Sequence, residues 1–228
     1  MATFVLVHGA WHGSWCWKRV RRALQQQGHE VFTPTLTGIG ERTHLLAADV
    51  NLQTHIQDIL NLIRWEELDD FVLCVHSYGG MVAAGVADQI SERIRSLLFL
   101  DAFVPETGQC LEDFAPIAAE QLVDGWKCRP ISAETFGVNT SDRAWVDSQC
   151  TPQSRACFSQ RVQLTGGLAR VNRIAYVYAT GWAGDESLFF PFYEKARSRG
   201  WKTSRIDCGH DVMIDRPAAV TQMLLDGI

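Results

Sequence analysis

The feature that most constrains the fold is an apolar run that ends at a sharp turn and passes directly into a helix. The run Phe71–Val75 follows two aspartates and is typical of a strand that other layers cover on both faces. The turn 76–80 follows, and small and apolar residues at helical spacing come after it. A serine at such a strand-to-helix corner is lifted out of the sheet, so that its oxygen can be approached from one side. Ser77 is therefore a candidate nucleophile.

The turn departs from the usual G-x-S-x-G pattern at its first position. Val75 stands where the pattern has a glycine. That position needs a small side chain because two backbones approach each other there. The turn by itself therefore leaves two interpretations open, a catalytic serine or a buried serine in an ordinary α/β protein.

Strand and helix patterns alternate along most of the chain. Apolar runs predict strands at 3–7, 29–36, 71–75, 94–102, 174–180 and 203–207. Helical spacing predicts helices at 18–27, 52–65, 80–90, 188–199 and 217–225. This alternation predicts an α/β fold, with a mostly parallel sheet and helices on both of its faces.

The alternation stops between Pro105 and residue 172. This segment shows no strand pattern and only fragments of helix, and it is too long for a plain loop in a compact domain. We expect a helical cap, inserted after the strand that ends near Asp101 and folded over the carboxyl edge of the sheet. The predicted domains are therefore an α/β core, residues 1–104 and 173–228, and a cap, residues 105–172.

Composition and charge narrow the classes of partner. The 228 residues suit one globular domain with a sizeable core, and the net charge of −5 with no basic block argues against nucleic acid and anionic membranes. No charged leader or long apolar segment is visible, so we expect a cytoplasmic protein. The seven cysteines are scattered and predict neither a disulfide framework nor a zinc site, and we expect no metal and no cofactor. Whether the chain forms a homodimer is left open.

A serine nucleophile needs a base to accept its proton and a carboxylate to orient that base. His210 follows the last predicted strand, where the serine–acid–histidine chain order places the base. Two aspartates satisfy this order as the acid. Asp101 closes an apolar strand, where a charge is costly unless it is paired, whereas Asp185 lies in a loop among glycine and acidic residues. We favour Asp101.

Backbone N–H groups near the serine would stabilise a developing oxyanion. The natural donors are Tyr78, which follows the serine, and Ala10, in the turn after the first strand. Three tryptophans, Trp11, Trp126 and Trp145, are candidates to line an apolar substrate pocket under the cap.

Together these segments resemble the α/β-hydrolase superfamily over nearly the whole chain. The loop His8–Trp15 and the stretch Phe103-Val104-Pro105 are similar to the branch that contains plant methyl esterases, hydroxynitrile lyases and their bacterial esterase relatives. This resemblance implies that Ser77 is the nucleophile and His210 the base. It also implies the same two oxyanion donors that the turns suggest.

The resemblance also concerns the acid and the chemistry. The plant members carry their acid after the penultimate strand, and in the lyases a lysine follows it. Here the region Gly181–Ser187 contains no lysine, and Ala10 fills a position where lyases carry a hydroxyl residue, which disfavours cyanohydrin cleavage. Bacterial esterases of this branch commonly show a Leu-Asp-Ala-Phe-Val-Pro stretch like residues 100–105 here, which favours Asp101.

The sequence thus predicts a cofactor-free serine hydrolase whose partner is a small, fairly apolar carboxylic ester or lactone, cleaved through an acyl-enzyme intermediate. Two alternatives stay open. One is a ligand-binding sensor, or a weakly active protein, on a hydrolase scaffold, for which Val75 is the best support. The other is carbon–carbon bond hydrolysis or lyase chemistry by the same three residues.

Overall fold

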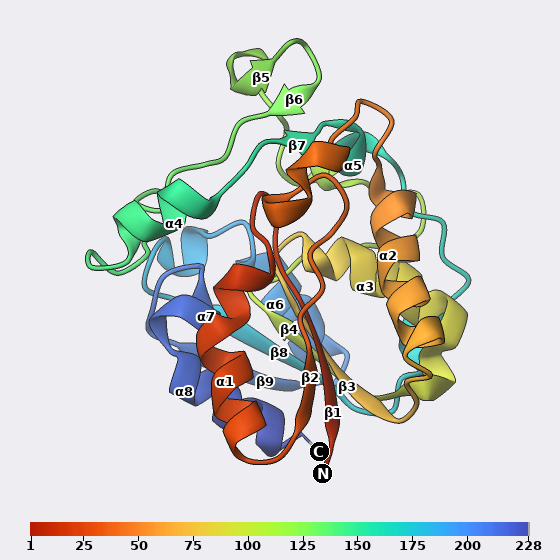
Figure 1. Cartoon of the computed structure of the whole chain (residues 1–228). Helices are drawn as coiled ribbons and strands as arrows, with labels where there is room; N and C mark the ends of the chain where they lie inside the picture. Colours follow the sequence, from red (N-terminus) through yellow and green to blue (C-terminus); the bar gives the residue numbers. More distant parts are fainter. Residues whose placement is uncertain (228) are drawn as a thin grey trace.

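A six-stranded parallel sheet runs through the middle of the molecule (Figure 1). The structure, a computed structural model, describes residues 1–227, so residue 228 of the predicted core lies outside the described residues. The strands are β1 (Thr3–Val7), β2 (Glu30–Phe32), β3 (Phe71–His76), β4 (Ile94–Leu100), β8 (Ile174–Ala179) and β9 (Lys202–Ile206). Their spatial order is β2-β1-β3-β4-β8-β9, and every neighbouring pair is parallel. The predicted parallel sheet is confirmed.

The direction in which strands are added reverses beside β1. The chain leaves β1 for β2 on one side and later adds β3, β4, β8 and β9 on the other side. In open α/β sheets, ligands bind outside the carboxyl ends of the strands at such a reversal. The loops that follow β1 and β3 are therefore where the fold favours a functional site.

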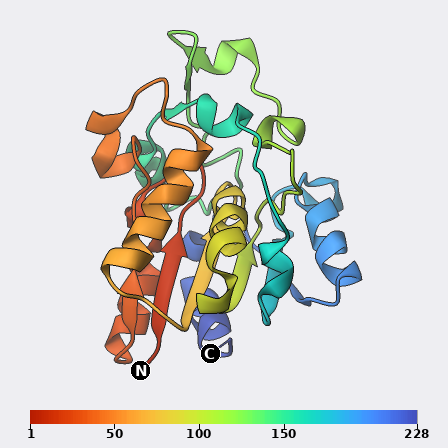
Figure 2. The same ribbon diagram turned by 90° about the vertical axis from the view of Figure 1, so that its right-hand side faces the viewer.

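Helices cover both faces of the sheet. One face carries α1 (Lys18–Gln26), α7 (Val212–Asp215) and α8 (Pro217–Leu225), and the other carries α2 (Leu52–Trp65), α3 (Gly79–Ile90) and α6 (Phe190–Ser198). Figure 2 shows α2 and α3 side by side on their face. All residues of β3 are buried, which explains why its sequence is a continuous apolar run rather than an alternating one.

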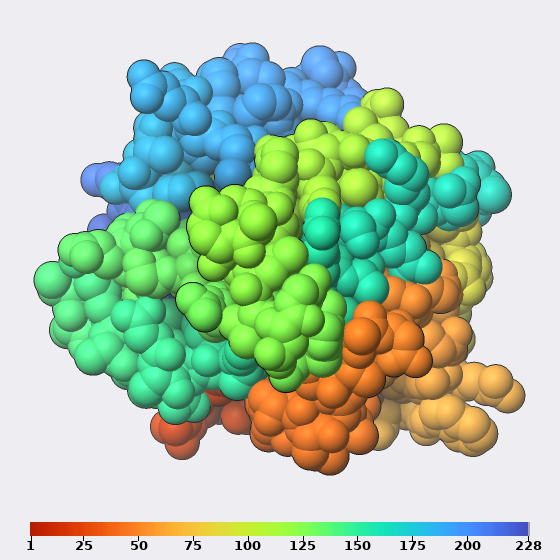
Figure 3. All heavy atoms as spheres, turned by 90° about the horizontal axis from the view of Figure 1, so that it is seen from above, coloured from red at the N-terminus to blue at the C-terminus, as the bar shows by residue number. Residues whose placement is uncertain are grey.

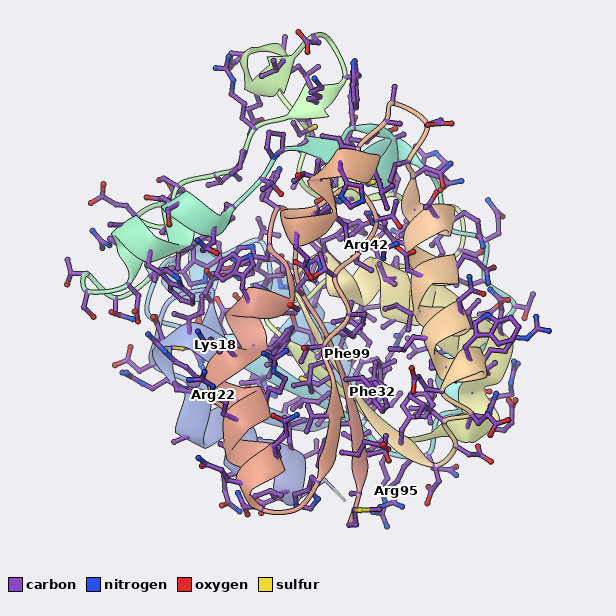
Figure 4. All side chains as sticks on the ribbon, viewed as in Figure 1. Lys18, Arg22, Phe32, Arg42, Arg95 and Phe99 are labelled. Carbon is purple, nitrogen blue, oxygen red and sulfur yellow. The ribbon has the colours of Figure 1, made fainter. Side chains whose placement is uncertain are left out.

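The helix α1 shows how a local pattern sets the packing. Val20 and Leu24 are one turn apart and fully buried against the sheet. Lys18 and Arg22 lie on the outer side of α1, whereas Phe99 of β4 lies in the interior (Figure 4). The apolar stripe therefore fixes which side of α1 meets the core.

The helix α2 begins at a reciprocal cap. The Asn51 side chain accepts a hydrogen bond from the Thr54 N–H at 3.0 Å, and the Thr54 hydroxyl accepts one from the Asn51 N–H at 3.3 Å. Ile56, Ile59 and Ile63 then recur at helical spacing and are buried. The helix therefore starts where its capping residues place it and faces the core with its apolar side.

The segment between β4 and β8 contains no strand of the main sheet. It holds the short helices α4 (Arg143–Gln149) and α5 (Ala156–Ser159) and an antiparallel sheet of β5 (Leu122–Val123), β6 (Lys127–Cys128) and β7 (Gln153–Ser154). The expectation of a segment without strands was wrong, because strands of two residues are too short to show alternation. Figure 3, seen from above, shows this segment, coloured green to teal, spread across the end of the molecule that faces the viewer.

Short 3₁₀ helices complete the described chain. They are η1 (Ser14–Trp17), η2 (Gly40–Leu45), η3 (Ser91–Arg93), η4 (Leu111–Asp113), η5 (Ala119–Gln121), η6 (Gly167–Arg170) and η7 (Gly184–Glu186). No helix within residues 1–227 is both long enough and apolar enough to cross a membrane.

Candidate active site

Ser77 occupies the corner between β3 and α3 in a strained conformation. Its φ is 52°, in the left-handed region that residues with a side chain seldom adopt. The backbone there is held on both sides, because the Ser77 N–H donates to the Leu100 carbonyl at 3.3 Å and the Ser77 carbonyl accepts from the Phe103 N–H at 3.2 Å. The contacts with the chain around the end of β4 therefore stabilise a corner that Ser77 alone would avoid.

Glycines around this corner allow the backbones to approach. A Cβ on Gly80 would lie 1.9 Å from the Phe103 carbonyl oxygen, and one on Gly9 would lie 2.9 Å from the Ser77 Cβ. Val75, in contrast, is a fully buried core residue. The corner therefore forms with valine at this position, because the tight approaches fall at the neighbouring glycines.

His210 pairs with Asp101 after β4. The His210 Nδ1 lies 2.7 Å from the Asp101 Oδ2, and both side chains are buried. Asp101 also accepts hydrogen bonds from the Ala179 N–H and the Trp182 Nε1, each at 3.2 Å. Burial raises the pKa of the Asp101 carboxyl, the hydrogen bonds lower it, and the net pKa is above its ordinary value. Asp101 is thus a buried carboxyl that three N–H groups orient.

The other candidate acid lies away from this pair. Asp185 is in η7, is exposed, and forms an ion pair with Arg205 on the neighbouring strand β9. Within residues 1–227 the structure brings Asp101, and not Asp185, to His210.

Aromatic rings surround the His210 imidazole. The Phe189 ring stacks on it with centroids 4.8 Å apart and an interplanar angle of 14°, and Phe136 and Trp182 pack at 5.0 and 5.2 Å. The His210 N–H also donates to the Phe136 carbonyl at 2.8 Å. Sequence reasoning did not identify these three residues. Phe136 comes from the segment between β6 and α4, Trp182 and Phe189 come from the connection between β8 and α6, and no local pattern links them to His210. The ring is therefore fixed by contacts that only the fold brings together.

Ser77 and His210 open onto one cavity of about 100 Å³. The remaining lining is mostly apolar and comes from Ala10, Trp11, Phe103, Leu111, Ala115, Pro116, Ile117, Gln121, Ile131, Phe136, Phe158, Trp182, Leu188 and Phe189. Ser77 is 8% exposed, and within residues 1–227 no hydrogen bond joins it to His210. Such hydrogen bonds often tighten only when a substrate is bound. The cavity therefore brings a hydroxyl and an imidazole together among mostly apolar walls.

Two of the three predicted pocket tryptophans lie elsewhere. Trp11 lines the cavity, but Trp126 lies in the β5–β6 turn with the Lys127 ammonium 4.9 Å from its ring centroid. Trp145 lies on α4 and packs against Trp15 at 5.2 Å. Neither segment had a sequence signal that separates packing from pocket lining. A larger hollow of about 740 Å³ lies at the opposite end of the sheet and contains neither Ser77 nor His210.

The predicted oxyanion donors flank the corner. Tyr78 immediately precedes α3, and backbone N–H groups at a helix start are well placed to meet negative charge. The Tyr78 side chain is buried away from the cavity, with its hydroxyl 2.9 Å from the His55 Nδ1. Ala10 lines the cavity. Only the backbone of Tyr78 is therefore available to the site. No cluster of three or more potential ligands among residues 1–227 could hold a metal ion.

Comparisons with known proteins agree with this architecture. A family model described as the alpha/beta hydrolase family matches residues 4–223. A carbendazim hydrolyzing esterase of Nocardioides sp. (strain SG-4G) is 45% identical over 240 residues, 98% of each chain. Methylesterase 4 of Arabidopsis thaliana is 37% identical over 106 residues, 46% of this chain and 40% of that protein.

Solved structures show the same fold. An extracellular alpha/beta-hydrolase from a Paenibacillus species superposes with a TM-score of 0.83 at 23% identity, covering 100% of this chain and 99% of that one. Polyneuridine aldehyde esterase gives a TM-score of 0.74 at 21% identity, covering 99% and 98%. The chain therefore belongs to the alpha/beta hydrolase family, as its sequence predicted, and it is an esterase-type member of that family.

Proposed function

We propose that this protein is a serine hydrolase that cleaves a small, fairly apolar carboxylic ester or lactone through an acyl-enzyme intermediate, without a cofactor. The observation that carries the proposal is the pairing of the His210 Nδ1 with the buried Asp101 carboxyl at 2.7 Å. This pairing lies at a cavity that Ser77 also lines, from a strained strand-to-helix corner. Nucleophile, base and acid thus have the roles that acyl transfer requires.

The pairing with Asp101 determines which nitrogen of His210 acts. Its Nδ1–H donates to the carboxylate, so the Nε2 carries the lone pair that accepts the Ser77 proton. The Ser77 oxygen attacks the ester carbonyl, and the backbone N–H groups of Ala10 and Tyr78 stabilise the oxyanion. His210 then protonates the leaving alcohol, and in the second half it activates the water that releases the acid.

The cavity supports a small and largely uncharged substrate. Its lining is aromatic and aliphatic, with Gln121 as the polar side chain apart from the reacting groups. Burying a charged substrate group there would be costly without a partner. Carbendazim, the compound in the name of the Nocardioides relative, is a second candidate substrate, because a flat aromatic carbamate would suit aromatic walls.

We also propose that residues 105–172 act as a cap over a core made of residues 1–104 and 173–227. Support comes from the cavity, since this segment contributes Leu111, Ile117, Phe136 and Phe158 to its lining. Cytoplasmic location, the absence of nucleic-acid and membrane partners, and the state of association stay predictions.

Replacing Ser77 with alanine tests the proposal. We expect the turnover of p-nitrophenyl acetate to fall by about 1,000-fold or more, with folding retained by circular dichroism. Full turnover in this variant would overturn the proposed function. Acyl-enzyme formation also separates the alternatives, because a sensor would bind the ester without a burst of p-nitrophenol, and lyase chemistry would leave the ester intact.

A further inference from the structure

A second buried histidine–carboxylate pair lies behind the candidate active site. The His12 Nε2 is 3.0 Å from the Asp211 Oδ2, and the two side chains are 2% and 0% exposed. Asp211 directly follows His210, and His12 lies in the loop after β1, two residues beyond Ala10. The pair therefore connects the two loops that carry the proposed base and an oxyanion donor.

The hydrogen bonds of His12 define its charge. Its Nδ1 lies 2.7 Å from the Ala10 carbonyl oxygen, which can only accept, and its Nε2 faces the Asp211 carboxylate. When the Asp211 carboxyl is ionised, both nitrogens donate, and the ring is an imidazolium. The Trp15 ring stacks on His12 with centroids 5.0 Å apart, a contact that suits a cation.

The electrostatics agree with this assignment. Burial lowers the pKa of His12, but the charge and hydrogen bond of Asp211 outweigh it, so that the net pKa is raised. Burial likewise raises the pKa of Asp211, and His12 outweighs it, so that the net pKa is lowered. Both changes favour the charged pair.

Two neighbouring imidazoles are neutral by the same reasoning. The His8 Nε2 accepts the Leu36 N–H at 3.1 Å, which a protonated nitrogen could not do, and burial lowers the pKa of His8 to about 3. His76 donates from its Nε2 to the His210 carbonyl at 3.0 Å, and burial first of all holds its pKa well below the ordinary value. Of these three imidazoles, His12 carries the charge.

The remaining groups that face the pair leave this charge assignment in place. They are His8, His76, His210, Cys16 and Cys150. Burial raises the pKa of both thiols, so the thiols are uncharged. The second Asp211 oxygen has no hydrogen-bond partner among residues 1–227 and lies 3.7 Å from the His76 Nε2. The carboxylate thus depends on His12 for its compensation.

We propose that His12, as an imidazolium, and Asp211, as a carboxylate, are positioning residues that hold the Ala10 turn and the His210 loop in register for catalysis. The inference rests on the proposed function, because that function makes Ala10 an oxyanion donor and His210 the base. From the Ala10 carbonyl, the connection runs through the His12 ring and the Asp211 carboxylate to the residue that carries the base. His76 fixes the His210 loop at a second point, through its hydrogen bond to the His210 carbonyl.

Neither His12 nor Asp211 lines the cavity, so their effect must appear in the chemical step rather than in substrate binding. We expect Asp211→Asn, which keeps the shape but removes the charge, to lower kcat about 100-fold while KM stays within about twofold, because small displacements of reacting groups cost this much. His12→Gln should lower kcat similarly.

A pH profile distinguishes positioning by the charged pair from general loss of packing. Without the carboxylate, burial lowers the pKa of His12, so its proton is lost as the pH rises. The ratio of the kcat of Asp211→Asn to that of the wild type should therefore fall with rising pH. In the double variant His12→Gln/Asp211→Asn the ratio should be independent of pH, and the exposed His44→Gln serves as the matched control with unchanged kcat.

Nitrogen NMR of the histidine rings tests the charge without any activity. Both nitrogens of His12 should stay protonated in the wild type and in Ser77→Ala up to about pH 8, which is above the ordinary histidine pKa of about 6.5. A neutral His12 ring at pH 7 would overturn the inference even if Asp211→Asn does not fold. A folded Asp211→Asn with wild-type kcat would overturn it too. The proposed function fails separately, through an active Ser77→Ala.

Discussion

Among residues 1–227, two buried histidine–aspartate pairs are joined by a hydrogen bond, and they have similar separations but different surroundings. His210 and Asp101 lie 2.7 Å apart, and His12 and Asp211 lie 3.0 Å apart. In the first pair the Nδ1 of the histidine is the ring nitrogen with a hydrogen-bond partner among the described residues, and the ring lines the cavity beside Ser77. In the second pair both ring nitrogens of His12 have hydrogen-bond partners, and His12 does not line the cavity. The first imidazole therefore has a free ring nitrogen at the cavity, as the proposed base requires, and the second does not.

The carboxylates differ as well. Three N–H donors orient Asp101, yet burial dominates and its net pKa is raised. Asp211 faces an imidazolium, and its net pKa is lowered. A histidine–carboxylate distance by itself therefore says little about catalysis, because the partner of the second ring nitrogen decides whether the histidine acts as a base or as a fixed cation.

The largest expected effect comes from neutralising the two candidate acids, Asp101 and Asp185, one at a time. Asp101→Asn should lower kcat/KM by about 1,000- to 10,000-fold, because the amide no longer holds His210 in the tautomer that leaves its Nε2 unprotonated. Asp185→Asn, which removes only an exposed ion pair with Arg205, should stay within about twofold of the wild type. Steady-state ester hydrolysis measures both, and the opposite order of effects would make Asp185 the acid.

The second prediction concerns stability and the second pair. Because the pKa of Asp211 is lowered on folding, its contribution is present above its unfolded pKa and is lost as the pH falls through its folded pKa. Because the pKa of His12 is raised, its contribution is complete below its unfolded pKa of about 6.5 and is lost as the pH rises through its folded pKa. The pair should therefore stabilise the fold most between about pH 4 and 6.5.

Urea unfolding checks this window. Between about pH 4 and 6.5, the unfolding free energy of Asp211→Asn should be about 3 kcal/mol lower than that of the wild type, as expected when one partner of a buried ion pair is removed. The difference from the wild type should shrink towards lower pH, and His44→Gln is again the control. A difference that is the same at every pH would show that the pair contributes through packing alone.

The smallest expected effect concerns the hydrogen bond from Trp182 to Asp101 in the first pair. Trp182→Phe keeps the aromatic wall beside His210 but removes the indole N–H that donates to Asp101. Losing a donor to the ionised carboxyl raises the pKa of Asp101, so the acid limb of the kcat/KM profile should move to higher pH, and kcat should fall about tenfold. An unshifted acid limb would mean that the indole N–H does not hold the carboxylate.

The sequence predicted the fold because its local patterns and its global topology agree. The run at β3 and the stripe of α1 appear where the apolar periodicity indicated, whereas β4 ends at Leu100, two residues before the predicted end. Chain order pointed to His210, and its place at the end of an apolar strand favoured Asp101, which pairs with His210. Val75 shows the limit of motif reasoning, because nearby glycines provide the close approaches that the pattern assigns to this position.

Other parts of the site had no local signal. Phe136 and Phe189 reach His210 from loops whose sequences give no hint of that contact. His12 and Asp211 are 199 residues apart, so their pairing depends on tertiary structure alone. Trp126 and Trp145 show the reverse error, because a tryptophan in the inserted segment looks the same in sequence whether it packs on the surface or lines a pocket.

The most direct test of the central claim is to identify the residue that reacts covalently with a fluorophosphonate. Peptide mapping by mass spectrometry should find one adduct, on Ser77, and labelling should be absent in Ser77→Ala and strongly slowed in His210→Gln, because the serine then lacks its base. An intact wild-type enzyme that hydrolyses esters while Ser77 stays unlabelled, or an adduct on a different residue, would contradict the account.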